Sequence, residues 1–236
     1  MTDFHSHFLP GIDDGSDSIE TSLAMLNVWQ EQGIERLCAT PHFYADHNTP
    51  RRFLRRREEA FTSLTAAMEE AGLHIPILLG AEVRFFDGIS GAEELPELCL
   101  QGTNLLLVEM PFTKWTDRMI SEVDDIRRRG IRPVAAHIER YLDLNPKKTI
   151  QRFMDMDIMI QCNAEFFLSR RTSRKALRML KDERIHFLGS DAHNMRSRQP
   201  NLRPALDLIE KKLGSDAIRR LMEFEYFIDA GREAFV

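Results

Sequence analysis

Short apolar segments alternate along this chain with longer segments in which apolar residues recur every three or four positions. The apolar segments lie at residues 2–6, 36–41, 77–82, 105–109, 133–138, 158–163 and 186–191. The segments with helical periodicity lie near residues 18–32, 51–71, 117–129, 146–156 and 171–183, followed by 202–213 and 215–223. This repeat predicts parallel strands joined by crossover helices.

The apolar segments are almost continuously hydrophobic, which is typical of a parallel sheet that is buried on both faces. Seven repeats of strand and helix favour an α/β fold of the TIM-like barrel type, closed or nearly closed. A doubly wound open sheet is the alternative. Because the composition does not shift along the 236 residues, we expect a single domain over residues 1–236.

Composition narrows the class of protein further. A net charge of −5 argues against extensive nucleic-acid binding, although the basic stretch 51–57 is either a solvated helix face or a local surface for anions. The longest apolar run, at 105–108, is too short for membrane insertion, and the N-terminus lacks the features of a signal peptide. We therefore expect a cytoplasmic protein, whose cysteines, Cys38, Cys99 and Cys162, are buried and reduced.

Side chains that bind metals follow almost every apolar segment. In chain order they are His5 and His7, His42, Glu82, Glu109, His137, Asn163, and Asp191 and His193, with Asp13 and Asp14 in the loop after the first segment. In barrels and open α/β sheets the active site lies at the carboxyl ends of the strands, so these side chains should meet. His5 and His7 are two residues apart on an extended segment and so point to the same side.

The donor types and their number predict a metal cluster. Imidazole and carboxylate without thiolate suit Zn²⁺, Mn²⁺ or Fe²⁺, which the ligand types alone do not separate. The donors exceed what one ion can use, so we expect two or three ions, with Glu82 best placed to bridge neighbours roughly 3.5–4 Å apart. A single histidine or glutamate after a strand is often structural, but such groups after seven consecutive strands favour metal binding. His47 could reach the mouth of the site, whereas His74 and His186 match none of these positions.

Thiol chemistry of the cysteine-dependent phosphatases is excluded. Those enzymes need an arginine six residues after the cysteine to hold the phosphate. The residues six positions after Cys38, Cys99 and Cys162 are Tyr44, Leu105 and Leu168. The sequence also lacks a Walker-type phosphate loop and a Gly-x-Ser-x-Gly motif.

Five short motifs connect the chain with a known family. They are Asp3-Phe4-His5-Ser6-His7 with Leu9-Pro10-Gly11-Ile12-Asp13-Asp14-Gly15, Thr40-Pro41-His42, Gly80-Ala81-Glu82, His137-Ile138-Glu139-Arg140-Tyr141, and Ser190-Asp191-Ala192-His193-Asn194. Together they resemble the polymerase and histidinol phosphatase (PHP) superfamily, and within it the bacterial capsule-synthesis tyrosine-protein phosphatases. The resemblance implies a seven-stranded distorted (β/α)7 barrel with three divalent transition-metal ions, Mn²⁺ foremost and Fe or Zn²⁺ as alternatives.

The resemblance also implies roles for individual residues. It assigns His5, His7, Glu82 and Asp191 to one ion, Glu82, Glu109 and His137 to a second, and Asp14, His42 and His193 to a third. Arg140 and Arg198 resemble the arginines with which the family holds phosphate. Two choices stay open, because Asp13 adjoins Asp14 and Arg196 lies two residues from Arg198.

The expected activity is hydrolysis of phosphotyrosine by a metal-bridging hydroxide, with Glu82, Arg140 and Arg198 as the catalytic residues. The resemblance implies a phosphotyrosine protein substrate, a bacterial tyrosine kinase that regulates capsule or exopolysaccharide synthesis. Tyr141, next to Arg140, would offer an aromatic wall for the substrate ring. A small-molecule phosphatase, such as one for histidinol phosphate, is the competing enzyme. A binding module that uses metal only for structure is the alternative from another class.

Overall fold

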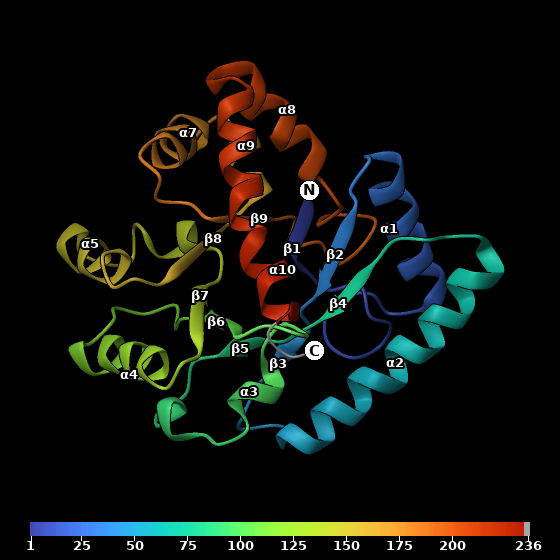
Figure 1. Ribbon diagram of the computed structural model, residues 1–236, viewed down its shortest axis with the longest axis horizontal. Helices are drawn as coiled ribbons and strands as arrows, with labels where there is room; N and C mark the ends of the chain where they lie inside the picture. Colours follow the sequence, from blue (N-terminus) through green and yellow to red (C-terminus); the bar gives the residue numbers. More distant parts are fainter. Residues whose placement is uncertain (234–236) are drawn as a thin grey trace.

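The computed structural model describes residues 1–233, with the strands at the centre and the helices around them (Figure 1). The strands are β1 (Thr2–Ser6), β2 (Arg36–Ala39), β3 (His42–Phe43), β4 (Ile77–Leu79), β5 (Glu82–Arg84), β6 (Leu105–Glu109), β7 (Arg132–Ala135), β8 (Met159–Asn163) and β9 (Phe187–Gly189). The α-helices are α1 (Ile19–Glu31), α2 (Pro50–Ala71), α3 (Leu95–Leu98), α4 (Asp117–Arg128), α5 (Lys147–Met154), α6 (Ala164–Leu168), α7 (Ser173–Lys181), α8 (Leu202–Leu213), α9 (Ser215–Phe224) and α10 (Tyr226–Glu233). Two 3₁₀-helices are η1 (Ile89–Gly91) and η2 (Ile138–Tyr141).

The strands form two sheets in which every pairing is parallel. One sheet has the order β1-β2-β4 and the other the order β3-β5-β6-β7-β8-β9. An isolated parallel bridge between Ser6 and Ala192 brings the chain after β9 back beside β1. The parallel α/β architecture is therefore confirmed, but within residues 1–233 nine shorter strands replace the seven continuous ones that we expected.

The difference arises because the second and third predicted strands each break in two. The chain bends at Pro41, which has no N–H to donate to a sheet, and at Gly80. Hydrogen bonds continue through both bends, since Gly80 N donates to Ala39 O (2.8 Å) and Glu82 N donates to Pro41 O (3.0 Å). His42 and Glu82, expected at strand ends, therefore begin β3 and β5, where they are partners in the parallel register.

Two further predicted strands are shorter than expected. β7 ends at Ala135, and residues 138–141 form η2 instead of continuing the strand. β9 ends at Gly189, before Asp191. In both places the predicted ligand, His137 or Asp191, lies beyond the end of the strand, where its backbone can leave the extended conformation.

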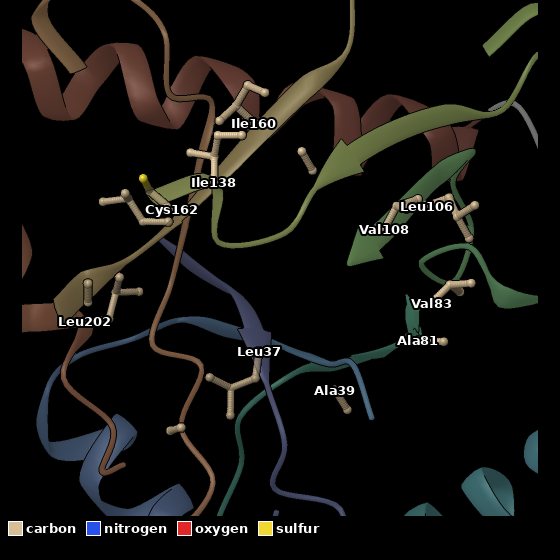
Figure 2. Packing of buried hydrophobic residues seen from close by; sticks show 14 of the residues in the cluster. Leu37, Ala39, Ala81, Val83, Leu106, Val108, Ile138, Ile160, Cys162 and Leu202 are labelled. Atoms are coloured by element: carbon tan, nitrogen blue, oxygen red, sulfur yellow. The ribbon is translucent and has the colours of Figure 1, made fainter. Parts of the chain in front are cut away.

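The core has an outer and an inner layer that alternate along the strands. Leu106 and Val108 belong to the outer cluster, which includes Ile120 and Val123 of α4 and is shown in part in Figure 2. Leu105 and Leu107 belong to a separate inner cluster. Its other fully or nearly fully buried members are Phe4, Cys38, Leu78, Leu100, Val134, Ala136, Met159, Phe187 and Ile228. This alternation is the two-residue period of strands whose two faces are both buried.

Helix α10, which the sequence analysis did not predict, closes one end of the inner cluster. It crosses the middle of the ring of strands in Figure 1, and its Ile228 is fully buried among the inner residues. The Arg132 guanidinium lies 4.5 Å from the centre of the Phe227 ring. Arg36 of β2 forms ion pairs with Glu225 (3.3 Å) and Asp229 (2.5 Å). Apolar packing and charge therefore both fix α10 to the strands.

The cysteines behave as expected. Cys38, Cys99 and Cys162 are buried and form no disulfide in the described chain. Burial raises the pKa of Cys99 to about 12, so a reactive thiolate is scarce there. Within residues 1–233, no helix has both the length and the apolar character needed to cross a membrane.

Candidate metal centre

Glu82 lies at the centre of a group of histidines. Its Oε2 is 3.2 Å from His5 Nε2, 3.3 Å from His7 Nε2 and 3.0 Å from His42 Nδ1. Its Oε1 is 2.8 Å from His137 Nε2. Burial raises the pKa of Glu82, but the surrounding histidines outweigh burial and hold it well below its ordinary value. The carboxylate is therefore anionic and able to bridge cations.

The predicted ligand atoms form three overlapping groups. In each group the donor atoms lie within 4.8 Å of one another: His5, His7 and Glu82; His7, Asp14, His42 and His193; and His42, Glu82 and Glu109. His137 joins the last group, with its Nε2 3.6 Å from Glu109 Oε1. Asp191 joins the first, with its Oδ1 3.5 Å from His7 Nε2. The fold thus brings together all nine residues predicted to bind metal.

Unsatisfied atoms indicate that this cluster fits cations. In the described chain, His42 Nδ1, Glu82 Oε2 and His193 Nε2 are buried, and none of their close contacts has the geometry of a hydrogen bond. Buried polar atoms nearly always have a partner, and leaving one unpaired costs about 1–3 kcal/mol. Neutral imidazole and carboxylate are donors that divalent transition metals accept, so bound ions would satisfy all three atoms at once.

The two neighbouring aspartates have different surroundings. The side chain of Asp13 is buried, and its Oδ2 accepts hydrogen bonds from His7 Nδ1 (2.8 Å) and His42 N (2.9 Å). Asp14 is exposed, and its Oδ1 lies 3.4 Å from His42 Nε2 and 3.6 Å from His193 Nε2. This geometry favours Asp14 as the ligand. Asp13 instead fixes the ring of His7, as carboxylates behind ligand histidines do.

Asp191 holds two arginines at the edge of the cluster. Arg198 Nη2 lies 2.6 Å from Asp191 Oδ1, while Arg140 bonds to Oδ2. Asn163 Nδ2 also donates to Oδ2 (2.8 Å). Burial raises the pKa of Asp191, but the nearby histidines and Arg140 keep it below its ordinary value. Arg196 is exposed, so of the two candidates it is Arg198 that reaches the site.

Backbone strain occurs at two of the predicted ligands. His137 and Asp191 have φ angles of 31° and 53°, in the left-handed region that residues other than glycine rarely adopt. Gly189 permits the close approach of β9 to β1, because a Cβ there would lie 2.5 Å from the Cβ of His5. Strain of this kind persists where the surroundings enforce it and is common at functional sites.

Comparisons with known proteins identify the family of this chain. Residues 1–225 match the family model for capsular polysaccharide synthesis proteins, CpsB/CapC. The chain belongs to this family. It is 28% identical over 233 residues to the tyrosine-protein phosphatase CpsB of Streptococcus agalactiae serotype III (strain NEM316), which covers 94% of each chain. It is 29% identical over 233 residues to the tyrosine-protein phosphatase YwqE of Bacillus subtilis (strain 168), covering 94% of this chain and 89% of YwqE.

This member of the CpsB/CapC family has the same fold as a relative whose structure is solved. The match comes from crystal structures of YwqE from Bacillus subtilis and CpsB from Streptococcus pneumoniae, described as unique metal-dependent tyrosine phosphatases. The TM-score is 0.86 at 27% identity, and the match covers 97% of this chain and 94% of the other. The family resemblance inferred from the sequence motifs is therefore confirmed.

One residue at the centre was missed by the sequence analysis. Gln161 of β8 is fully buried, and its Oε1 lies 3.2 Å from His5 Nδ1 and accepts a hydrogen bond from His137 N (2.6 Å). Its Nε2 donates to Asn163 Oδ1 (3.0 Å). Gln161 thus fixes the orientation of His5 and the backbone at His137. The sequence feature that could have revealed Gln161 is its polar side chain in the middle of a mainly apolar strand.

Tyr141 does not offer the aromatic wall that we expected. Tyr141 is fully buried, so it cannot contact a substrate ring. Phe112, in the loop after β6, lies parallel to Tyr141 at 5.4 Å and keeps 46% of its surface exposed. Tyr44 stacks on His42 at 5.1 Å. His47 is exposed and contacts the Tyr44 ring, so it reaches His42 only through Tyr44.

The basic stretch at the start of α2 is not a uniform solvated face. Arg57 is buried and donates to Gly80 O (2.8 Å), at one of the two bends. Arg56 donates to Gly11 O (3.2 Å) and Ile12 O (3.0 Å), in the loop that leads to Asp13. Two of these arginines therefore support the backbone beside the metal centre.

Proposed function

We propose that this protein is a metal-dependent protein-tyrosine phosphatase, a phosphoric monoester hydrolase that acts without a covalent phosphoenzyme. One observation carries the proposal: Asp191, which belongs to the nine clustered donors, also forms ion pairs with two arginines, Arg140 and Arg198. A site that only stabilised the fold would need the donors but not the arginines. The names of the relatives, which are tyrosine-protein phosphatases, point to the same reaction.

The nine residues would hold three divalent ions, with Mn²⁺ foremost and Fe or Zn²⁺ as alternatives. The three overlapping donor groups support three positions, and Glu82 contributes to two of the groups. When bound, such ions supply Lewis acidity and lower the pKa of water toward neutrality. The donors then act as neutral imidazoles and carboxylates. His7, whose pKa burial would lower but Asp13 and Glu82 raise to about 10, must release a proton when it binds metal.

The arginines position the phosphoryl group. A planar guanidinium can bind two phosphoryl oxygens at once, which fixes the orientation of the group and compensates its charge. Arg140 and Arg198 approach Asp191 from two different segments, and each side chain is 35% exposed. Each guanidinium can therefore reach a substrate from the solvent side while its residue stays beside the cluster. Asn163, which bonds the same carboxylate, keeps Asp191 in place.

The family supports a substrate and a biological setting. The matched family model is for capsular polysaccharide synthesis, so we propose a phosphorylated bacterial tyrosine kinase in capsule or exopolysaccharide regulation as the substrate. We also propose that the two sheets together form the seven-stranded distorted (β/α)7 barrel, with β2 and β3 as one strand and β4 and β5 as another. The single domain over residues 1–236 and the cytoplasmic location stay predictions.

Steady-state kinetics on two substrates test the proposal. The metal-loaded protein should hydrolyse a phosphotyrosyl peptide with a higher kcat/KM than histidinol phosphate. Faster hydrolysis of histidinol phosphate would indicate a small-molecule phosphatase. No hydrolysis of either substrate by protein with bound metal would indicate a binding module.

A further inference from the structure

The ring of Phe112 is unusually placed for an exposed aromatic residue. It lies three residues after the predicted ligand Glu109 and is 46% exposed. It is parallel to the ring of His137, with centroids 5.9 Å apart and an interplanar angle of 17°. His137 is in turn stacked with His5 at 5.7 Å. A series of near-parallel rings therefore leads from the centre of the cluster to the solvent and ends at Phe112.

Phe112 rests on a rigid base. Beneath it lies Tyr141, which is fully buried and 5.0 Å from the ring of Trp115. Trp115 fixes the loop at two points, because its Nε1 donates to Pro111 O (3.1 Å) and its N donates to Asn145 Oδ1 (2.7 Å). One face of the Phe112 ring is thus held by the protein, so little ordering entropy remains to be lost when a ligand covers the other.

The segment beneath Phe112 also carries a phosphate-binding candidate. Tyr141 directly follows Arg140, whose guanidinium bonds Asp191. A phosphate held by Arg140 beside the cluster would therefore leave its ester substituent close to the loop that carries Phe112. An aromatic substituent gains from offset stacking there, whereas an alkyl chain does not.

We infer that Phe112 selects aryl phosphates, by stacking its exposed ring on the aromatic ring of the phosphotyrosine substrate. This inference rests on the proposed phosphatase function and extends it to a residue outside the metal centre and the arginines. Phe112 binds the substrate ring and takes no part in proton transfer. Its removal should therefore raise KM for a phosphotyrosyl peptide and leave kcat nearly unchanged.

Competitive inhibition by two phosphonates tests the inference without hydrolysis of the probe. Phenylphosphonate carries the aryl ring and methylphosphonate lacks it, while both present the same anionic group to the arginines. In the metal-loaded protein, Phe112→Ala and Phe112→Leu should raise Ki for phenylphosphonate about three- to tenfold, the range expected from loss of one aromatic contact. Ki for methylphosphonate should not change, and Phe112→Trp should retain tight binding of phenylphosphonate.

A matched control is Met222→Ala. Met222 is 48% exposed and lies on α9, which contributes no residue to the described metal centre, so this variant should bind both phosphonates like the wild type. Equal weakening of both inhibitors by Phe112→Ala would overturn the inference, because it would indicate a distorted centre. Wild-type affinity of Phe112→Leu for phenylphosphonate would overturn it too. Failure of the wild type to hydrolyse any phosphotyrosyl peptide would instead defeat the proposed function.

Discussion

The inward-facing side chains of β6 and β8 change character from one end of each strand to the other. On β6 the row runs from Leu105 and Leu107, in the inner apolar cluster, to Glu109 in the metal centre. On β8 it begins at Met159 in the same cluster and continues through Gln161. The same two-residue period thus serves both the packing of one end and the chemistry of the other.

The two ends are stabilised by different interactions. At the apolar end, Ile228 of α10 completes a cluster in which every side chain gains from leaving water. At the polar end, His7, His137 and Glu82 are just as buried but depend on one another for charge compensation. Changes at the apolar end should therefore alter stability, and changes at the polar end should alter metal binding and catalysis.

The largest effect is expected at Glu82. Glu82→Gln keeps the volume of the side chain but removes the charge that four histidines surround. We expect bound metal to fall and kcat/KM for a phosphotyrosyl peptide to drop at least about a hundredfold, since Lewis-acid stabilisation is worth several kcal/mol. Elemental analysis and kinetics on the same sample measure both. A variant with wild-type metal content and activity would remove Glu82 from its proposed role.

At the apolar end, Ile228→Ala should act on stability alone. Ile228 is fully buried, and truncating a buried isoleucine to alanine costs about 2–5 kcal/mol. Urea unfolding should show this loss in the free energy of unfolding, while kcat/KM stays at the wild-type value in folded protein. Loss of metal by the folded variant would show that the two ends are coupled and would contradict their separate roles.

These two ends also differ in how well the sequence predicts them. The clustering of the candidate ligands could be predicted because histidine and carboxylate after apolar segments are conspicuous. The division of the second and third strands could not, because hydrogen bonding continues through the bends and the apolar pattern does not change at Pro41 or Gly80. Helix α10 could not be predicted either, because its docking depends on Ile228 meeting strands that lie far away in the sequence.

The role of Asp13 provides a smaller test at the polar end. Asp13→Asn removes the charge that faces His7 Nδ1 but leaves every proposed ligand in place. Metal affinity should fall about ten- to a hundredfold, as is typical when a carboxylate behind a ligand histidine is lost. Competition with a chelator of known affinity measures the change. If Asp13→Asn lowered the number of bound ions as much as Asp14→Asn does, Asp13 would have to be a ligand itself.

The smallest effect concerns His186, which lies near the apolar end. Burial lowers its pKa from 6.5 to about 4, and its Nδ1 accepts a hydrogen bond from Ile160 N (2.9 Å). The folded state therefore keeps His186 neutral, while the unfolded state binds a proton below pH 6.5. Stability should fall as the pH drops through this range. Between about pH 6.5 and pH 5, the wild type should lose roughly 1 kcal/mol more than His186→Asn.

Urea unfolding of both proteins at the two pH values measures this difference. The comparison is made between the two proteins because all other titrating groups contribute equally to both. The same loss of stability in His186→Asn as in the wild type would show that His186 does not contribute.

Metal removal and readdition tests most directly the claim that the polar end binds a catalytic metal cluster. The protein is stripped with a chelator, divalent ions are added back in steps, and bound metal and hydrolysis of a phosphotyrosyl peptide are measured at each step. We expect no turnover without metal and full turnover as binding approaches about three ions per chain, the number that the donor groups could accommodate. Full turnover by the metal-free protein would contradict this account.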